Sequence, residues 1–432
     1  MYGYLYRANI SWQNIHGRTT KFTRIAPLLI STAMVHSIAS CIVAAFSIAV
    51  AAAATVADPE CQTTAPQQHT INVHTAHMNM TDPPFGIVYA RSDIAFVGAG
   101  FKVDMLNTTS FRPTLAREIM LPESLTQSAE SETDGAASGL AVSRDKRYVY
   151  ASIGLGAAII DVEKAIAGDT NPVVGVLLGT TGVSAIEVTV SPDDDYVFVT
   201  QEYGTNTTRH RGTIEVFQIH RSSNGSVHGT NKGYAPLGYA VVGTELSHDG
   251  SRMYVTSEVT GQATSQNETQ GTLSVLDVAT LKTNPAKALL RTVDAGCSPV
   301  RLTLSPDGRH VWVTARLSNK LLAFDTAKLD SDHPEGALQA SVQVGTSPVG
   351  VIFVNNGRHI ITADSDRFDY PNATTGLTVV DVEAALGGAQ VFPRIPTGLF
   401  PREFAMSPDG KTLLVSEYQS KAIQAVDLTR LS

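Results

Sequence analysis

Three charged side chains occupy a position that is otherwise glycine in a recurring sequence pattern. A turn of the type Ser-Pro-Asp-Gly recurs along the chain, and the residue six positions before its Asp or Asn is Glu187, Arg301 or Glu403 in three copies. Two carboxylates and a guanidinium brought together can bind a carboxylate or polarise a carbonyl, and a carboxylate can act as a general base. We therefore take Arg301, Glu403 and Glu187 as candidate catalytic residues, with structural ion pairing as the open alternative. The remaining copies have Gly86, Gly139, Gly243 and Gly350 at this position.

A second set of polar residues supplies candidate binding groups. Most of them stand eight or nine residues after the same turn, where a loop follows a strand-like run, and loops of this kind often carry ligands. The alternative is that the acids face solvent and that the histidine lies in a mobile loop. The set comprises Glu202, Glu258, Arg316, Asp364 and Glu417, together with Glu245 in an inner run and His210 in a long loop.

The elements that must position these residues are the units of a repeat of about fifty residues. The copy "RLTLSPDGRHVWVTARLSNKLLAFD", residues 301–325, reads as strand, tight turn, strand, short loop and strand, and a fourth strand-like run follows it. Four antiparallel strands at this period predict an all-β fold, a seven-bladed β-propeller of four-stranded blades. The turns are marked by Asp145, Asp193, Asp249, Asp307, Asn356 and Asp409, with a weaker copy near Asp93.

The two chain ends are expected to close the ring. The seventh copy stops after its third strand, at Asp427 and Leu428, while the stretch "HTINVHTAH", residues 69–77, precedes the first copy. We predict that this stretch supplies the outer strand of the last blade, because closure removes open sheet edges. The predicted organisation is a signal peptide or signal-anchor over 1–57, an N-terminal tail with the closing strand over 58–82, and the propeller over 83–432.

The pattern "SPDG…VWVT…LLAFD…VQVGTSPVG" resembles the YVTN-type seven-bladed propellers, near the lactonase and carboxymuconate-cyclase-like and the quinoprotein amine dehydrogenase-like propellers. The resemblance covers residues from about 69 to 432 and implies a site on the top face, the end of the ring where the first strand of each blade begins. It implies a hydrolase or cyclase acting on a lactone or a carboxylate-bearing small molecule. Arg301 would anchor the carboxylate or stabilise an oxyanion, and Glu403 or Glu187 would act as general base, directly or through a water. A non-enzymatic scaffold that binds a protein, glycan or small ligand through the top-face loops is the second reading, because one fold carries many functions.

The N-terminal segment predicts entry into the secretory route. Basic residues precede an uncharged run from Ala26 to Ala54, and Thr55-Val56-Ala57 offers a cleavage site. The run is long enough to span a bilayer, so an uncleaved anchor stays open as the alternative, and the membrane would be a partner only then. Glycosylation sequons fit an exported glycoprotein and stand at Asn79, Asn107, Asn206, Asn224, Asn267 and Asn372.

Charge and cysteine content limit the partners. The net charge of −8 argues against nucleic acid, which would need a basic face. No Cys-x-x-Cys motif, histidine pair at ligand spacing or phosphate loop occurs, so we expect no metal and no cofactor, and we expect a monomer with a small-molecule ligand. If Cys41 leaves with the signal segment, Cys61 and Cys297 either form a disulfide that staples the tail to the body or stay free thiols.

Overall fold

The computed structural model describes residues 61, 65, 68–125, 136–182, 184–260 and 270–431. The predicted signal segment and the sequon at Asn267 lie outside these residues. Within the described ranges, no helix combines the length and apolar character needed to cross a bilayer.

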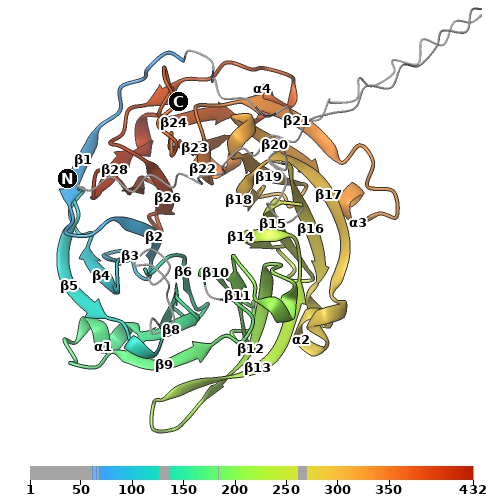
Figure 1. Ribbon diagram of the computed structural model, residues 1–432. Coiled ribbons are helices and arrows are strands. Elements are labelled where there is room, and N and C mark those ends of the chain that lie inside the picture. The colour runs from blue at the N-terminus through green and yellow to red at the C-terminus, as the bar shows by residue number, and fades with distance from the viewer. Residues whose placement is uncertain are drawn as a thin grey trace, which may run out of the picture. The chain divides into compact units, whose positions relative to one another are not determined.

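Seven four-stranded antiparallel sheets form a ring around a central axis (Figure 1). This arrangement confirms the predicted all-β seven-bladed propeller. We number the blades in chain order. Blades one to three comprise β2 (Pro84–Tyr89), β3 (Ile94–Ala99), β4 (Lys102–Asn107) and β5 (Thr114–Met120); β6 (Leu140–Val142), β7 (Tyr148–Ile153), β8 (Gly156–Asp161) and β9 (Val173–Leu178); and β10 (Ala185–Val190), β11 (Tyr196–Gln201), β12 (Thr213–Arg221) and β13 (Val227–Pro236).

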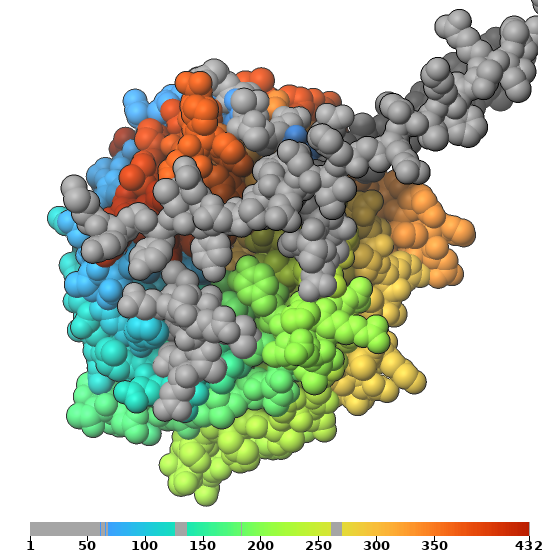
Figure 2. Space-filling model, viewed as in Figure 1, coloured from blue at the N-terminus to red at the C-terminus, as the bar shows by residue number. Residues whose placement is uncertain are grey.

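The remaining blades follow the same order from the axis outwards. The long β12–β13 hairpin of blade three projects from the rim of the molecule (Figure 2). Blades four to seven comprise β14 (Tyr239–Leu246), β15 (Arg252–Val259), β16 (Gln270–Asp277) and β17 (Leu289–Cys297); β18 (Pro299–Leu304), β19 (His310–Ala315), β20 (Lys320–Asp325) and β21 (Leu338–Gln343); β22 (Pro348–Val354), β23 (His359–Asp364), β24 (Gly376–Asp381) and β25 (Arg394–Ile395); and β26 (Pro401–Met406), β27 (Thr412–Glu417) and β28 (Ala422–Asp427), completed by β1 (Thr75–Asn79).

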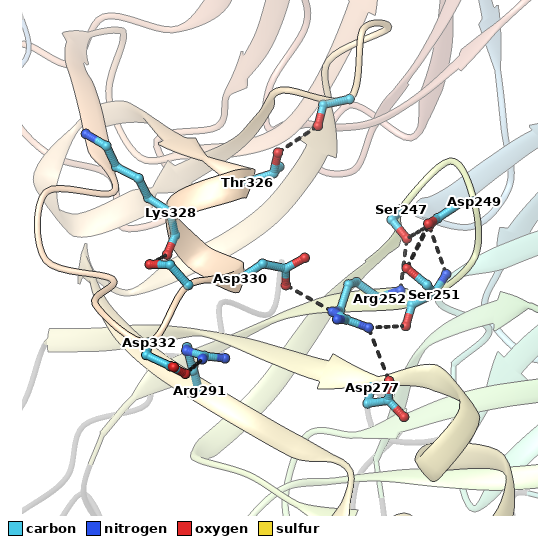
Figure 3. Close-up of polar contacts among 12 residues, drawn as sticks. Ser247, Asp249, Ser251, Arg252, Asp277, Arg291, Thr326, Lys328, Asp330 and Asp332 are labelled. Carbon is cyan, nitrogen blue, oxygen red and sulfur yellow. Dashed lines mark hydrogen bonds and ion pairs between the residues drawn. The ribbon is translucent and has the colours of Figure 1, made fainter.

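The Ser-Pro-Asp-Gly sequence closes the turn between the first and second strands through a local hydrogen-bond set. In blade five the Ser305 hydroxyl donates to Asp307 at 2.6 Å, the Asp307 carboxylate accepts from the Arg309 amide at 3.0 Å, and the His310 amide donates to Ser305 at 2.9 Å. Gly308 takes a φ of 72°, which favours glycine. Figure 3 shows the same set in blade four. There the Arg252 side chain also donates to Asp277 of the same blade and to Asp330 of blade five.

The third strand of most blades ends in an aspartate that caps a short helix. Asp277, for example, accepts from the Thr280 amide at 2.8 Å, which satisfies a free helix N–H. In blade one Asn107 takes this place and binds the Thr109 amide instead, and no helix follows. The helices are α1 (Val162–Ile166), α2 (Val278–Thr283), α3 (Thr326–Asp330) and α4 (Val382–Leu386), with single 3-10 turns at η1 (Glu123–Leu125), η2 (Asn206–Thr208), η3 (Pro285–Lys287), η4 (Arg316–Ser318), η5 (Asn355–Gly357) and η6 (Leu428–Arg430).

The core is divided among the seams between blades. Seven apolar clusters of the described residues each draw side chains from two neighbouring blades, so that no blade buries its apolar faces alone. Trp312, Tyr150, Phe96 and Phe198 are among the largest fully buried side chains. Each blade therefore depends on its neighbours for most of its hydrophobic stabilisation.

The N-terminal strand closes the ring as predicted, but the strand lies about four residues further along the chain than predicted. β1 pairs with β28, with Thr75 opposite Val426 and Asn79 opposite Ala422, rather than being centred on residues 70–76. The earlier part of the tail runs along blade six, where the Ile71 amide donates to the Arg394 carbonyl at 2.9 Å. Met78 packs into the seam of blades seven and one, which fixes this register because a slip of one residue would turn the side chain to the other face.

A disulfide ties the tail to the body of the propeller. Cys61 is bonded to Cys297, the last residue of β17, with a Cα–Cα distance of 5.5 Å. Of the two alternatives that the sequence left open, the structure therefore has the bridge. It closes a loop of 236 residues in sequence separation, which restricts the unfolded chain.

Replacement of the seam residue of the closing strand should weaken the whole ring. Met78→Asp places a carboxylate at a side chain that is 7% exposed, and we expect a loss of unfolding free energy of about 2–4 kcal/mol. The control is Met120→Asp in β5, where the side chain is 67% exposed and the effect should stay within about 0.5 kcal/mol. Denaturant unfolding followed by circular dichroism measures both, and equal effects would contradict the role of β1 in closure.

Candidate functional site

The structure brings the three predicted catalytic residues into one ion-paired cluster. They project from the inner strands β10, β18 and β26, which converge near the axis. Arg301 Nε lies 2.8 Å from Glu403 Oε1 and Arg301 Nη2 lies 3.2 Å from Glu187 Oε2. Arg301 Nη1 donates to the carbonyl of Val242. All three nitrogens of the guanidinium are thus engaged within the protein.

Crowding of the inner strands explains why the other blades have glycine here. A Cβ on Gly350 would lie 2.2 Å from the carbonyl oxygen of Arg402, and one on Gly139 would lie 2.9 Å from Glu187 Oε1. A side chain fits only where neighbouring glycines leave space for it. The charged cluster therefore needs the glycines of the neighbouring blades.

A cavity of about 160 Å³ lies beside the cluster in the channel. Thr244 and Glu245 of β14, Leu302 of β18 and Val351 of β22 complete its lining. The cavity is smaller than the roughly 300–1,000 Å³ of pockets that enclose drug-sized ligands. It suits a very small molecule or the reactive end of a larger one. Its acidic lining residues are Glu187, Glu245 and Glu403, and Arg301 is the one cation among the residues that line it.

Two of these acids have strongly raised pKa values. Burial raises the pKa of Glu187 to about 7, with Arg301 opposing the shift and Glu403 adding to it. Burial and the nearby Glu187 together raise the pKa of Glu245 to about 8. Burial also disfavours the charged form of Arg301, but Glu403 and Glu187 outweigh it and raise the pKa of the guanidinium. At neutral pH the raised pKa values therefore favour the protonated form of Glu245 and leave Glu187 close to its midpoint.

An apolar ring separates the cavity from the top face. Five of its members stand one residue before the glycine or charged residue of their strand, and Phe400 stands three residues before Glu403. They therefore lie nearer the top face than the charged cluster. The side chain of Tyr418 packs against the ring. Sequence reasoning missed this feature, although five of the seven copies have an apolar residue directly before the key position. The ring consists of Phe85, Ile186, Val242, Val300, Val349 and Phe400.

Arg402 interrupts this ring, and sequence reasoning missed it too. Its guanidinium stacks on Phe85 at 3.5 Å and lies 5.5 Å from the ring of Phe400 and 5.7 Å from that of Tyr418. Its buried Nε has no hydrogen-bond partner. Burial lowers the pKa of Arg402 to about 9, against the opposing effect of Glu403. Among the described residues no carboxylate forms an ion pair with Arg402, in contrast to Arg301.

Three of the predicted binding residues form a second cluster at the top-face ends of the second strands. Arg316 is ion-paired with Glu258, and the Ser298 hydroxyl donates to Glu258 at 3.1 Å. Burial, together with Glu258, raises the pKa of Glu202. The ring of Phe368 lies 5.5 Å from the Arg316 guanidinium. The cluster is an acidic group around a single buried arginine.

Asp364 and Glu417 lie inside their blades, where they hold connecting segments. Asp364 accepts from the Thr378 hydroxyl at 2.6 Å, and burial raises its pKa to about 7. Glu417 accepts from the Gly398 amide, in the connection to β26, at 2.7 Å. Their geometry is that of buried hydrogen-bond acceptors rather than of groups facing a ligand.

His210 lies exposed in a top-face loop. Its backbone has a φ of 62°, and its amide donates to the Thr205 carbonyl at 2.9 Å. Within the described part of the chain its side chain contributes no contact to either cluster. No group of three or more His, Cys, Asp or Glu side chains among the described residues is arranged to hold a metal ion.

Comparison with known proteins adds information on the fold only. No protein-family model matches the sequence, and no curated protein matches it. The chain is similar to a solved structure of Kuenenia stuttgartiensis hydrazine synthase, with a TM-score of 0.57 and 14% identity over 82% of this chain and 98% of that one. The chain is a seven-bladed β-propeller. Identities this low show the architecture and no activity.

Two further solved structures point to the same architecture. One is the β-propeller domain of Myceliophteria thermophila Cps50 (Swd1), with a TM-score of 0.55 and 12% identity over 81% of this chain and 99% of that one. The other is a chain of a mitotic checkpoint complex, with a TM-score of 0.58 and 13% identity over 90% of this chain and 99% of that one. These propellers have varied functions, so the site must be judged from its own residues.

The raised pKa of Glu245 predicts a pH dependence of stability. The folded protein keeps the Glu245 proton up to pH about 8, whereas the unfolded chain releases it near the usual value of 4.5. This contribution to stability is fully present below pH 4.5 and is lost as the pH rises through about 8. Glu245→Gln removes the titration, so its melting temperature should fall less than that of the parent between pH of about 5 and about 9.

Thermal unfolding at several pH values provides the measurement. The matched control is Glu335→Gln, because Glu335 is exposed in the loop before β21 and should leave the pH profile unchanged. A Glu245→Gln profile parallel to that of the parent would show that this carboxyl is not protonated in the fold at neutral pH.

Proposed function

We propose that the protein is an exported YVTN/lactonase-like propeller that hydrolyses or forms a lactone in a small carboxylate-bearing molecule at the top-face end of the channel. The observation that carries the proposal is the cavity lined by Glu187 and Glu245, two acids with raised pKa values, next to Arg402, whose guanidinium forms no ion pair among the described residues. A cation without an ion-pair partner, set in an aromatic surround, is a ready site for an anion.

Arg402 takes the role of carboxylate anchor in this proposal. The sequence suggested Arg301 for that role, but Arg301 is engaged by Glu187, Glu403 and a backbone carbonyl. We assign Arg301 to positioning Glu187 and Glu403. Arg402 directly precedes Glu403 in β26, and its charge also affects the pKa of Glu187. Because both acids line the cavity, a ligand held by Arg402 would extend toward the cavity.

The acids account for both proton transfers of lactone hydrolysis. Glu187 removes a proton from water as the water oxygen attacks the lactone carbonyl carbon, and the ring C–O bond breaks. Glu245, protonated at neutral pH, donates its proton to the departing alkoxide oxygen. The product is a hydroxy acid, and the proton on Glu187 then returns to Glu245. Lactone formation follows the same steps in reverse.

Export is part of the proposal and is supported by three features. The Cys61–Cys297 disulfide suits an oxidising compartment. Sequon residues Asn79, Asn206, Asn224 and Asn372 are exposed, and Asn107 is half-buried. The hydrophobic N-terminal segment supplies a targeting signal, with an anchored form of the protein as the alternative to a secreted one.

Turnover of a panel of lactones that carry a carboxylate tests the proposal on protein purified from the full-length chain. Glu187→Gln should lower kcat by at least about 100-fold, because it removes the general base. Arg402→Met should raise KM by at least about tenfold with a smaller effect on kcat, because it removes a charge-assisted contact to the substrate. Acid release at constant pH gives both constants.

Matched substitutions at exposed sites separate these effects from general damage. Glu335→Gln and Arg309→Met alter exposed side chains that do not line the cavity, and both should keep parental kinetics. Circular dichroism verifies that each variant is folded. A parent that turns over no lactone of the panel, or variants with unchanged constants, would contradict the enzymatic proposal.

The second candidate is a non-enzymatic scaffold that binds a partner through the top face. The observation that favours it is a set of exposed large apolar side chains in top-face loops, which is a feature of interaction surfaces. If this function holds, Tyr203→Arg or Phe368→Arg should abolish retention of the partner on immobilised protein, while Met120→Arg on the rim should not. The set consists of Phe101, Tyr203, Phe368 and Leu399.

A further inference from the structure

A second cavity, of about 290 Å³, lies at the bottom face between blades seven and one. The bottom face is the end of the ring that carries the Ser-Pro-Asp-Gly turns. The wall from blade one comes from the end of β2 and from the segment after β4, and the wall from blade seven comes from the turn around Asp409 and from β27. None of its lining residues lines the channel cavity, so the two sites are separate.

The cavity exists because blade one lacks the helix that follows the third strand in most blades. In blade four, α2 covers the seam with blade three, where Lys282 lies 2.7 Å from Asp193 and 4.9 Å from the ring of Tyr196. In blade five, Asp330 at the end of α3 reaches Arg252 of blade four at 3.0 Å (Figure 3). In blade one the short segment after Asn107 leaves the corresponding seam uncovered.

The cavity wall is rich in hydroxyl groups. A hydroxyl both donates and accepts hydrogen bonds, which matches a ligand whose own polar groups are hydroxyls. Burial raises the pKa of Tyr89 to about 12, so its hydroxyl keeps its proton. The turn carboxylate of Asp409 adds an acceptor. The hydroxyl-bearing residues are Tyr89, Ser92, Thr108, Thr109, Ser110, Ser407 and Thr412.

Aromatic and apolar groups supply the other half of the recognition. Phe111 lines the cavity and its ring is stacked on His74 with centroids 4.5 Å apart, which fixes the orientation of the ring. Pro408 and Leu414 contribute apolar surface on the side of blade seven. A pyranose ring presents hydroxyl groups around its edge and a C–H surface on its faces, and an aromatic ring packs well against such a surface.

We propose that the cavity between blades seven and one is a binding site for a neutral pyranose ring, with Phe111 against the sugar face and the hydroxyl-rich wall around its edge. The volume suits a single sugar ring and is close to the lower end of ordinary small-molecule sites. The site goes beyond the channel chemistry and does not depend on it. The sugar is either a free or partner-borne saccharide or the protein's own glycan on Asn107, which immediately precedes the lining residue Thr108.

Titration with methyl α-D-glucopyranoside, methyl α-D-mannopyranoside and N-acetylglucosamine, followed by saturation-transfer NMR and calorimetry, tests the proposal. We expect at least one of these sugars to bind in the millimolar range and sorbitol, which has the hydroxyls without the ring, not to bind. Phe111→Ala and Ser110→Trp should each weaken binding by at least about fivefold, the first by removing the stacking face and the second by filling the cavity.

The matched control is Phe101→Ala, which removes an exposed phenylalanine from the top face and should leave sugar affinity unchanged. The source of the sugar is distinguished by Asn107→Gln, which removes the sequon without altering a lining residue. Binding that appears only in this variant assigns the site to the protein's own glycan, and binding by both forms assigns it to an external saccharide. No binding by either form, or equal binding by the Phe111→Ala and Ser110→Trp variants and the parent, would overturn the proposal.

Discussion

The structure depends on apolar contact between neighbouring blades. Seven of the apolar clusters in the described chain are each shared by two adjacent sheets, so the free energy of folding is distributed around the ring rather than stored in any one blade. A ring of this kind is complete only when the first and last blades meet. The pairing of β1 with β28 and the packing of Met78 at that seam provide this contact.

The same convergence of blades controls the chemistry on the axis. Inner strands approach so closely that glycine is required in several blades, and a charged side chain placed there is removed from water. Arg301 compensates for this loss of hydration by forming ion pairs with Glu187 and Glu403. The Arg402 guanidinium instead stacks on the rings of Phe85 and Tyr418, and no acid forms an ion pair with it in the described structure. That difference is the reason why the proposed function assigns the substrate carboxylate to Arg402 rather than to Arg301.

The repeat made the architecture predictable, because its turn chemistry recurs in register and each copy has the same strand pattern. The grouping of Glu187, Arg301 and Glu403 followed from their shared position in the repeat. What the repeat did not show is direction and partnership: Asp364 and Glu417 share the register of loop residues but turn into the blades to bind connecting segments. The apolar ring, the role of Arg402 and the disulfide depend on contacts between copies, which one sequence does not display.

The closing strand has a consequence for the way the protein is made. Thr75 is among the first residues of the propeller to leave the ribosome, yet its partner Val426 is among the last. The ring therefore cannot be sealed until the whole propeller has been synthesised, and the pairing of β1 with β28, which has a large sequence separation, forms last. Until then β28 presents an open edge and the last seam is exposed to other chains. Protection of this open edge is thus most needed at the final step of folding, and a chain that terminates before β28 cannot form a closed ring.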